Sequence, residues 1–166
     1  MREFLDRRGF LSLTGAGVAG VALLAGCGFG SSAVAAGTFE VRKSPAEWRK
    51  QLGADRYNIL REGGTEPPFS SPLLNEHRRG TFACAGCALP LYSSAAKFES
   101  GTGWPSFWQP LPHAVAESRD SALGFVRTEI HCRRCGGHLG HVFQDGPKPT
   151  GLRYCMDGLA LQFRPV

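Results

Sequence analysis

The hydrophobic pattern changes from helical to strand-like along the chain. Ser44–Glu47 combines an N-cap serine, a proline at the first helical position and a glutamate three residues after the cap, which is the capping-box start of a helix. Trp48 and Leu52 lie four positions apart and therefore share one helical face. Gly53 is expected to end this helix, and a second short helix is expected to begin at Asp55.

Beyond residue 68 the apolar residues occur in short runs separated by Gly, Pro and Ser, which predicts strands at short spacing. The 22 glycines and 11 prolines agree with a fold rich in turns. In the last run, Leu159, Leu161 and Phe163 are expected to face a core, and the residues between them to face solvent. The predicted strands are 80–83, 89–92, 124–130, 141–143 and 158–163.

The start of the chain has the pattern of an export signal. Arg7-Arg8 forms a twin-arginine start, Val18–Ala25 is an apolar run too short to span a membrane, and Ala33-Val34-Ala35 offers a small-residue cleavage site. We therefore expect residues 1–36 to be a twin-arginine (Tat-type) signal. Residues 37–166 would then form the folded domain, exported to the periplasm or the cell envelope.

Leu24–Cys27 offers a second interpretation, because it is similar to a bacterial lipobox. Cleavage before Cys27 would leave a lipidated N-terminus, and membrane attachment is expected only in that case. Both interpretations place the domain outside the cytoplasm. The formal net charge of +5 comes from scattered Lys and Arg residues without a basic stripe, which argues against nucleic acid as a partner. We expect a monomer.

Four of the six cysteines form two C-x2-C pairs, a spacing at which one tight turn directs two thiolates at the same ion. Four sulfurs are a set that tetrahedral zinc prefers, and they leave no coordination position open, so the zinc would be structural. Gly86 and Gly136-Gly137 are expected to provide the positive φ that such turns need. Two disulfides, a C-x2-C redox pair and iron in the same cage are the alternatives. The expected ligands are Cys84, Cys87, Cys132 and Cys135.

Cys155 is the cysteine that neither the leader nor these pairs account for, so it is a candidate reactive thiol. Arg153 lies two positions earlier and would share its face in an extended strand, where a cation favours the thiolate. Asp157 would lie on the same face and would either oppose this effect or pair with Arg153.

Two further segments supply candidate partners for this thiol. His138 and His141 are candidate proton donors, although alone they could be spare metal ligands or ordinary surface groups. Trp104 lies in a loop between Gly and Pro and is expected to form a pocket wall, whereas Phe107 is expected in the core.

Together these motifs resemble the methionine-R-sulfoxide reductase B family over about residues 44–165. The resemblance implies a mainly β fold of the Mss4-like, β-tent type, with two antiparallel sheets, short N-terminal helices and a structural zinc site. The motifs that carry it are Gly64–Phe69, Cys84–Cys87, Lys97–Phe107, Cys132–Phe143 and Arg153–Cys155, in that order.

The resemblance also implies an activity. Cys155 would attack the R epimer of methionine sulfoxide, in oxidised proteins or peptides, and would become a sulfenic acid as methionine is released. The expected catalytic residues are Cys155, His141, His138, Arg153 and Asp157. The expected substrate-binding residues are Trp104, Phe143 and Asp145.

Two positions depart from the family pattern. Asp157 stands where the family usually has Asn, and an ionised carboxylate cannot donate the hydrogen bond that an amide can. Thr102 stands where many members carry a resolving Cys, so an external thioredoxin-like protein or small thiol is expected to reduce the sulfenic acid. The rival hypotheses are a zinc-stapled protein-binding module without catalysis, and a thiol peroxidase or disulfide oxidoreductase that uses Cys155.

Overall fold

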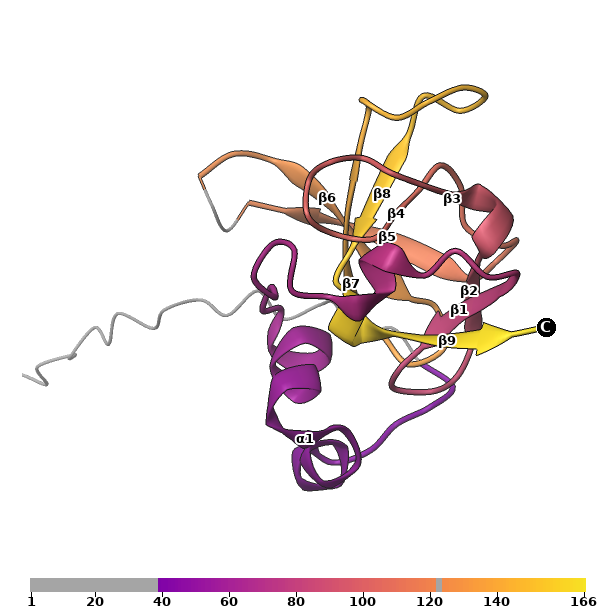
Figure 1. Ribbon diagram of the computed structural model, residues 1–166. Coiled ribbons are helices and arrows are strands. Elements are labelled where there is room, and N and C mark those ends of the chain that lie inside the picture. The colour runs from indigo at the N-terminus through magenta and orange to yellow at the C-terminus, as the bar shows by residue number, and fades with distance from the viewer. Residues whose placement is uncertain (1–38, 122–123) are drawn as a thin grey trace, which may run out of the picture. The chain divides into compact units, whose positions relative to one another are not determined.

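The computed structural model describes residues 39–121 and 124–166 (Figure 1). The predicted signal segment 1–36, its cleavage site and Cys27 lie outside the described residues, so export and lipidation stay predictions. Within the described ranges, no helix combines the length and the apolar character that crossing a membrane requires.

The helix α1 (Pro45–Glu62) forms where the capping box predicts and is interrupted at Gly53. Ser44 Oγ accepts the backbone N–H of Glu47, and the Glu47 carboxylate accepts the backbone N–H of Ser44. Gly53 has φ 72° and ψ 177°, which are not helical angles. The two predicted helices are therefore present as two segments of one element, separated at the residue where the break was expected.

The described residues form two antiparallel sheets, as expected for the predicted fold class. The smaller sheet has the strand order β2-β1-β9 and the larger one β3-β4-β8-β7-β6-β5. In Figure 1, β9 crosses the view below the strands of the larger sheet, and α1 lies below β9. The strands are β1 (Gly80–Cys84), β2 (Pro90–Ser93), β3 (Lys97–Phe98), β4 (Ser106–Phe107), β5 (Val115–Asp120), β6 (Arg127–Cys132), β7 (His138–Phe143), β8 (Arg153–Met156) and β9 (Leu161–Pro165), and the short 3-10 helices are η1 (Pro72–Asn75), η2 (Ser94–Ala96) and η3 (Gly158–Ala160).

The strand predictions are confirmed for β1, β2, β6 and β7, with ends that differ by a few residues. The predicted strand 158–163 is wrong in its first half, because Gly158–Ala160 forms a 3-10 turn before β9 begins at Leu161. Ala160 is consequently fully buried instead of facing solvent. The hydrophobic pattern does not predict β3, β4, β5 or β8, because the first two are two-residue strands and β5 is rich in charged residues.

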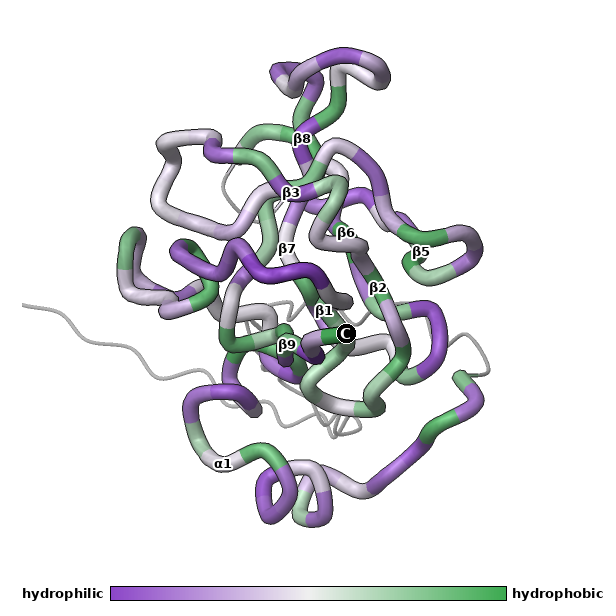
Figure 2. Tube along the Cα trace, turned by 45° about the vertical axis from the view of Figure 1, so that its right-hand side comes forward, coloured by the Kyte–Doolittle hydropathy of each residue, from purple (hydrophilic) through white to green (hydrophobic). Residues whose placement is uncertain are grey.

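Aromatic rings form the centre of the core. Tyr92 stacks on Phe107 with ring centroids 4.3 Å apart, and Phe82 packs edge-on against Phe107 at 4.9 Å. All three residues are fully buried, which confirms the core assignment of Phe107. Figure 2 shows short hydrophobic and hydrophilic stretches alternating along the tube.

One row of side chains crosses the larger sheet from β4 to β5. Directly opposed residues of antiparallel strands project from the same face of a sheet. Ser106 lies opposite Cys155, and Cys155 lies opposite His141. His141 in turn lies opposite Glu129, and Glu129 opposite Ser118. Strand pairing therefore places the predicted nucleophile beside a predicted proton donor.

A β-bulge in β7 adds His138 to this row. His138 and His141 are three positions apart, so in a regular strand they would point to opposite faces. The register between β6 and β7 shifts between Ile130 and His131, which leaves an extra residue on β7. The two imidazole rings consequently approach each other, with centroids 5.4 Å apart.

Gly140 permits the close pairing of β7 with β8. Its φ of 145° lies in the region that favours glycine. A Cβ atom at this position would overlap the carbonyl oxygen of Cys155. Any side chain at Gly140 must therefore push the strand of Cys155 away from β7.

Gly140→Ala is expected to destabilise the fold by more than ~2 kcal/mol, because both the backbone strain and the overlap with β8 must be relieved. Gly63→Ala is the matched control: Gly63, which follows α1, has φ 71° and ψ 25° in the left-handed region, but a Cβ there meets no atom within 4 Å. Its expected cost is about 1 kcal/mol. Urea unfolding followed by circular dichroism measures both, and equal costs would contradict the role assigned to Gly140.

Candidate active site and metal site

The four cysteines of the C-x2-C pairs form one cluster, with sulfur atoms within 4.8 Å of one another. The Sγ atoms of Cys84 and Cys135 are 3.7 Å apart, and those of Cys87 and Cys132 are 3.5 Å apart. A disulfide requires about 2.05 Å, so the two-disulfide alternative does not describe this structure. Four sulfurs placed tetrahedrally ~2.3 Å from one ion lie about 3.8 Å apart, so the cluster has the dimensions of a metal cage.

The two C-x2-C turns have the same backbone geometry. In each turn the N–H that follows the second cysteine donates to the carbonyl of the first, from Ala88 to Cys84 and from Gly136 to Cys132, both at 2.8 Å. Ala88 has φ 63° and Gly136 has φ 66°. The expectation that Gly86 supplies a positive φ is wrong, because each chain reversal takes its left-handed residue after the second cysteine rather than between the two.

The electrostatics of the cluster favour a bound cation. Hydrogen bonds among the crowded sulfurs raise the pKa of Cys84 and lower that of Cys87. Four thiolates at these distances repel one another, and a divalent ion that binds all four removes this repulsion. The backbone N–H of Gly86 also donates to Cys84 Sγ at 3.3 Å, which stabilises negative charge on that sulfur. The residues present therefore fit a tetrahedral metal ion with soft ligands.

Cys155 lies outside this cluster, half-buried on β8, with its Sγ 3.8 Å from Thr102 Oγ1. Ser100 Oγ fixes this neighbour by contacting Thr102 Oγ1 at 2.8 Å and Ser106 Oγ at 2.7 Å. Burial raises the pKa of the Cys155 thiol, whereas Thr102 and Arg153 lower it by smaller amounts. Arg153 therefore favours the thiolate, as expected, but desolvation outweighs its effect and leaves the pKa of Cys155 above the ordinary value.

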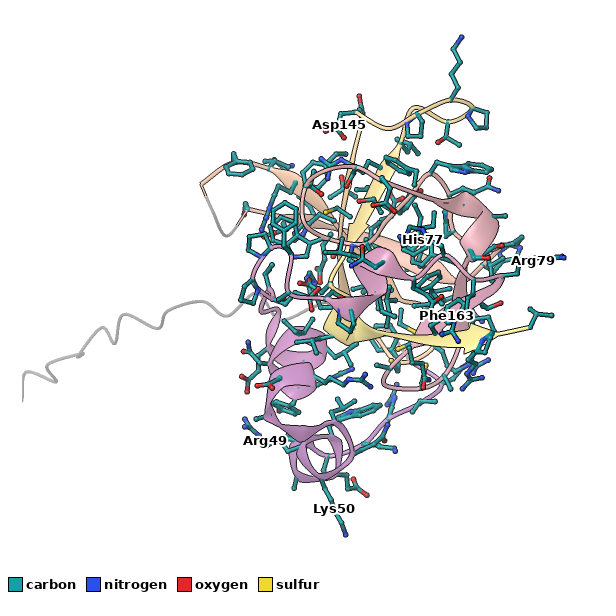
Figure 3. All side chains as sticks on the ribbon, in the orientation of Figure 1. Arg49, Lys50, His77, Arg79, Asp145 and Phe163 are labelled. Carbon is teal, nitrogen blue, oxygen red and sulfur yellow. The ribbon has the colours of Figure 1, made fainter. Side chains whose placement is uncertain are left out.

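Arg153 binds the carboxylate of Asp145, whereas the sequence suggested Asp157 as a possible partner. Its Nε and Nη2 donate to the two oxygens of Asp145 at 2.9 and 2.8 Å, and its guanidinium lies 4.4 Å from the centroid of the Phe143 ring. Arg153 therefore pairs with Asp145 and not with Asp157. Figure 3 shows Asp145 at the opposite end of the view from the labelled residues of α1.

Each histidine contacts a carboxylate that sequence reasoning missed. His141 Nε2 lies 2.8 Å from Asp120 Oδ2, to which Arg127 also donates at 2.6 Å. His138 Nδ1 lies 2.7 Å from Glu129 Oε1. Burial lowers the pKa of His141, which favours its neutral form, although Asp120 acts against this. The carboxylates come from β5 and β6, and their proximity to the histidines follows from strand register, which the motifs do not reveal.

Asp157 directly follows β8 and has 3% of its surface exposed. Its Oδ1 accepts the backbone N–H of Glu66 at 3.0 Å. Its Oδ2 lies 3.8 Å from His138 Nε2, a buried atom without a hydrogen-bond partner among the described residues. Burial raises the pKa of Asp157 to about 6, although the Glu66 N–H and His138 lower it. The protonated acid can donate a hydrogen bond, as an amide can.

Trp104 lines a hollow of about 350 Å³ together with the exposed ring of Phe69. The indole Nε1 donates to the backbone carbonyl of Glu66 at 3.1 Å. The next residue, Pro105, accepts the backbone N–H of Met156 at 2.9 Å. The Trp104 loop is therefore bound to β8 immediately beside Cys155.

The structure brings the expected catalytic residues to one region around β7 and β8, while Phe143 and Asp145 contact this region through Arg153. A half-buried free thiol that lies opposite His141, whose ring packs against that of His138, and apart from a four-cysteine cage, is the arrangement of a thiol-dependent oxidoreductase. Glu66, Asp120 and Glu129 are the carboxyl-bearing residues of this region that the sequence motifs did not assign.

Comparison with known proteins identifies the family. The SelR domain matches residues 52–165. The chain is 56% identical over 128 residues to the peptide methionine sulfoxide reductase MsrB of Agrobacterium fabrum, a match that covers 76% of this chain and 95% of that protein. The MsrB proteins of Leptospira interrogans and Thiobacillus denitrificans are 51% and 53% identical, over 76% and 74% of this chain and 97% and 94% of their own length. The chain therefore belongs to the methionine-R-sulfoxide reductase B family, which confirms the resemblance drawn from its motifs.

The purified chain is expected to carry one metal ion per molecule. Cys87→Ser and Cys132→Ser should each lose the ion and most of the fold's stability, because three sulfurs do not close the cage. Cys155→Ser should keep the full complement, since its sulfur is not part of the cluster. Elemental mass spectrometry measures the metal and circular dichroism the fold. A metal-free Cys155→Ser protein would contradict the separation of the two sites.

Asp157→Asn is expected to stabilise the protein at about pH 8 and to have little effect at about pH 4. The folded pKa of about 6 exceeds the ordinary value of 3.8, so burial of the ionised carboxylate destabilises the fold. This destabilisation is absent well below the lower pKa and reaches its full size above the higher one. The difference in pKa corresponds to about 3 kcal/mol. Urea unfolding at both pH values measures it.

Asp145→Asn is the control for this prediction. Asp145 has a pKa lowered by its hydrogen bonds with Arg153, so the same substitution should not stabilise the protein at about pH 8. Equal stabilisation by the two substitutions would contradict the assignment of the effect to the buried Asp157.

Proposed function

We propose that the protein is a peptide-methionine (R)-S-oxide reductase that returns the R epimer of methionine sulfoxide in oxidised proteins to methionine. The observation that carries the proposal is the position of Cys155, a free and half-buried thiol directly opposite His141 on the neighbouring strand. Family membership supports the substrate and the epimer. The site supplies a nucleophile, groups that can move a proton and an aromatic wall.

In the proposed reaction the sulfur of Cys155 attacks the sulfoxide sulfur, and the sulfoxide oxygen takes up the proton that the thiol releases. The S–O bond of the substrate breaks as the oxygen passes to Cys155. Methionine leaves with its sulfur reduced by two electrons, and Cys155 becomes a sulfenic acid. The raised pKa of Cys155 is compatible with this balance, because the thiol brings the proton that the oxygen needs.

His141 and Asp157 are the residues proposed to move this proton. His141 faces Cys155 from β7, and Asp120 holds its ring. Asp157 can donate a hydrogen bond to the oxygen while it is protonated. Arg153 contributes a positive charge and a hydrogen bond to Cys155, and it would stabilise the negative charge that develops during attack. His138, held by Glu129, would pack against the His141 ring and keep it in place.

Trp104 is proposed to contact the methyl group of the substrate, since sulfur compounds pack favourably on aromatic rings. The sulfoxide oxygen would then point toward the histidines. A site with an aromatic side and a polar side distinguishes the two epimers, because the wrong epimer would exchange oxygen and methyl. Phe143 and Asp145 would act on the substrate by fixing the guanidinium of Arg153.

Reduction of the sulfenic acid is proposed to come from an external thiol. The other four cysteines among the described residues belong to the metal cage, and Thr102 lies beside Cys155 where a resolving cysteine is common in the family. One thiol condenses with the sulfenic acid to give a mixed disulfide and water. A second external thiol then attacks this mixed disulfide. Cys155 leaves as a free thiol, and a disulfide joins the two external sulfurs. A thioredoxin-like protein or a small thiol would supply both.

The cage is proposed to hold one structural zinc ion, because four cysteine ligands leave no position for substrate. Export through residues 1–36, lipidation at Cys27 as the alternative, and a monomeric state are proposals that rest on the sequence. These proposals are compatible with one another, since export of an already folded domain would allow metal loading where thiols stay reduced.

The full-length protein with dithiothreitol is expected to reduce the R epimer of a methionine sulfoxide peptide and to leave the S epimer unchanged. Cys155→Ser should lower the rate by at least about a thousandfold while it retains the metal, since it removes the nucleophile and nothing from the cage. Chiral chromatography of the peptide measures both. A wild-type protein that turns over neither epimer would favour the hypothesis of a protein-binding module without catalysis. Faster turnover of peroxide or disulfides would favour a thiol peroxidase or disulfide oxidoreductase.

One turnover without reductant is expected to add a single oxygen to Cys155. Peptide mass spectrometry after trapping with a sulfenic-acid reagent locates it. A disulfide between Cys155 and another cysteine of the chain would contradict the proposed use of an external thiol.

A further inference from the structure

We infer that Glu66 is a positioning residue of the active site, whose carboxyl group holds the turn after Cys155 in register with the Trp104 wall. This inference rests on the proposed function and extends it to a residue outside the nucleophile's own segment. Glu66 lies in the loop between α1 and η1, and 4% of its surface is exposed.

The carboxyl group of Glu66 caps the start of η3. Its Oε1 accepts the backbone N–H of Gly158 at 2.5 Å, and its Oε2 accepts the backbone N–H of Leu159 at 3.0 Å. These two N–H groups directly follow Asp157, which does not cap η3 with its own side chain. A residue 92 positions earlier in the chain thus takes the role that the N-cap side chain of a helix usually has.

The hydrogen bonds between Glu66 and the segment after Cys155 run in both directions. Asp157 Oδ1 accepts the backbone N–H of Glu66 at 3.0 Å, while the Glu66 side chain accepts the N–H groups after Asp157. Three hydrogen bonds between buried or half-buried groups therefore join the two segments. Such bonds fix relative position closely, because water cannot replace a lost partner in a buried site.

The same loop residue also fixes the aromatic wall. The backbone carbonyl of Glu66 accepts Trp104 Nε1 at 3.1 Å. One residue therefore connects the indole that is proposed to contact the substrate methyl group with the turn that begins three positions after Cys155. Displacement of the Glu66 backbone would move Trp104 relative to Cys155.

The packing around the hydrogen bonds of Glu66 leaves little freedom for the turn Gly158–Ala160 to take another position. A Cβ atom at Gly158 would overlap Ser71 Oγ, so the turn lies directly against the η1 segment. The strand pairing that holds Cys155 is independent of Glu66, because β8 is bonded to β4 and β7. Loss of the Glu66 carboxyl group should therefore disturb substrate placement more than the reactivity of the thiol.

The test compares Glu66→Ala, Glu66→Gln and wild type with the R-sulfoxide peptide and dithiothreitol, at a temperature well below each unfolding midpoint. We expect Glu66→Ala to lower kcat/KM by about tenfold to a hundredfold through both a higher KM and a lower kcat, because misplacement of about 1 Å has effects of this size. The rate of Cys155 alkylation by iodoacetamide should stay within about threefold of wild type, because β8 keeps its pairing.

Glu66→Gln keeps the test decisive if Glu66→Ala does not fold. The amide retains one acceptor oxygen and presents its NH2 group to the other backbone N–H, so an intermediate loss of kcat/KM is expected. Glu47→Ala is the matched control, since Glu47 also accepts a backbone N–H, at 2.8 Å from Ser44, but at the exposed start of α1. It should keep the wild-type kcat/KM.

Three outcomes would overturn the inference. The first is a folded Glu66→Ala or Glu66→Gln protein with wild-type kcat and KM, which would show a purely structural role while the proposed function stands. The second is an equal loss in Glu47→Ala, which would show a general effect of reduced stability. The third is a wild-type chain that reduces neither epimer, which would overturn the proposed function together with the role of Glu66.

Discussion

Strand β8 is hydrogen-bonded along both of its edges, to β4 and to β7, and this pairing is the constraint on which the site depends. Because opposed residues share a face, Cys155 has Ser106 on one side and His141 on the other without any contribution from side-chain contacts. Gly140 allows the two backbones to approach. The position of Cys155 is thus a property of the sheet, and the selectivity proposed for the site comes from the loops around it.

Burial then decides which groups of the site carry charge. It raises the pKa of Cys155 and of Asp157 and lowers that of His141, so each of the three shifts toward its neutral form. The positive charge of Arg153 is balanced by Asp145, whose side chain lies at the exposed edge. The proposed reaction, which moves an oxygen atom and one proton between two neutral sulfur compounds, suits such a site because no net charge has to enter the buried region.

The sequence predicted the parts of this structure that depend on local pattern. The capping box predicts the start of α1, Gly53 predicts its interruption, and the paired C-x2-C turns predict the sulfur cluster. The pattern failed where register or tertiary contact decides. Ala160 is buried because Gly158–Ala160 forms a turn.

The same limit applies to the candidate site. Alternation of side chains along a regular strand would separate His138 from His141, and the bulge that reunites them follows from the pairing of β6 with β7. Asp120 and Glu129 are invisible to motif reasoning because they approach the histidines across strands. Likewise, the effect of Arg153 on Cys155 had the right sign, but its size relative to desolvation depends on burial that a linear pattern does not give.

The replacement of the family's usual Asn by Asp157 is compatible with the fold because of the hydrogen bond that the side chain makes. Its Oδ1 accepts the N–H of Glu66, a role that an amide oxygen and a carboxyl oxygen perform equally. The other oxygen lies near His138, and there the two side chains differ, since an amide donates at every pH and an acid donates only while protonated. Burial keeps the proton on Asp157 to a higher pH than in water. The substitution therefore preserves the structural contact with Glu66 and makes the donor function at the neighbouring atom depend on pH.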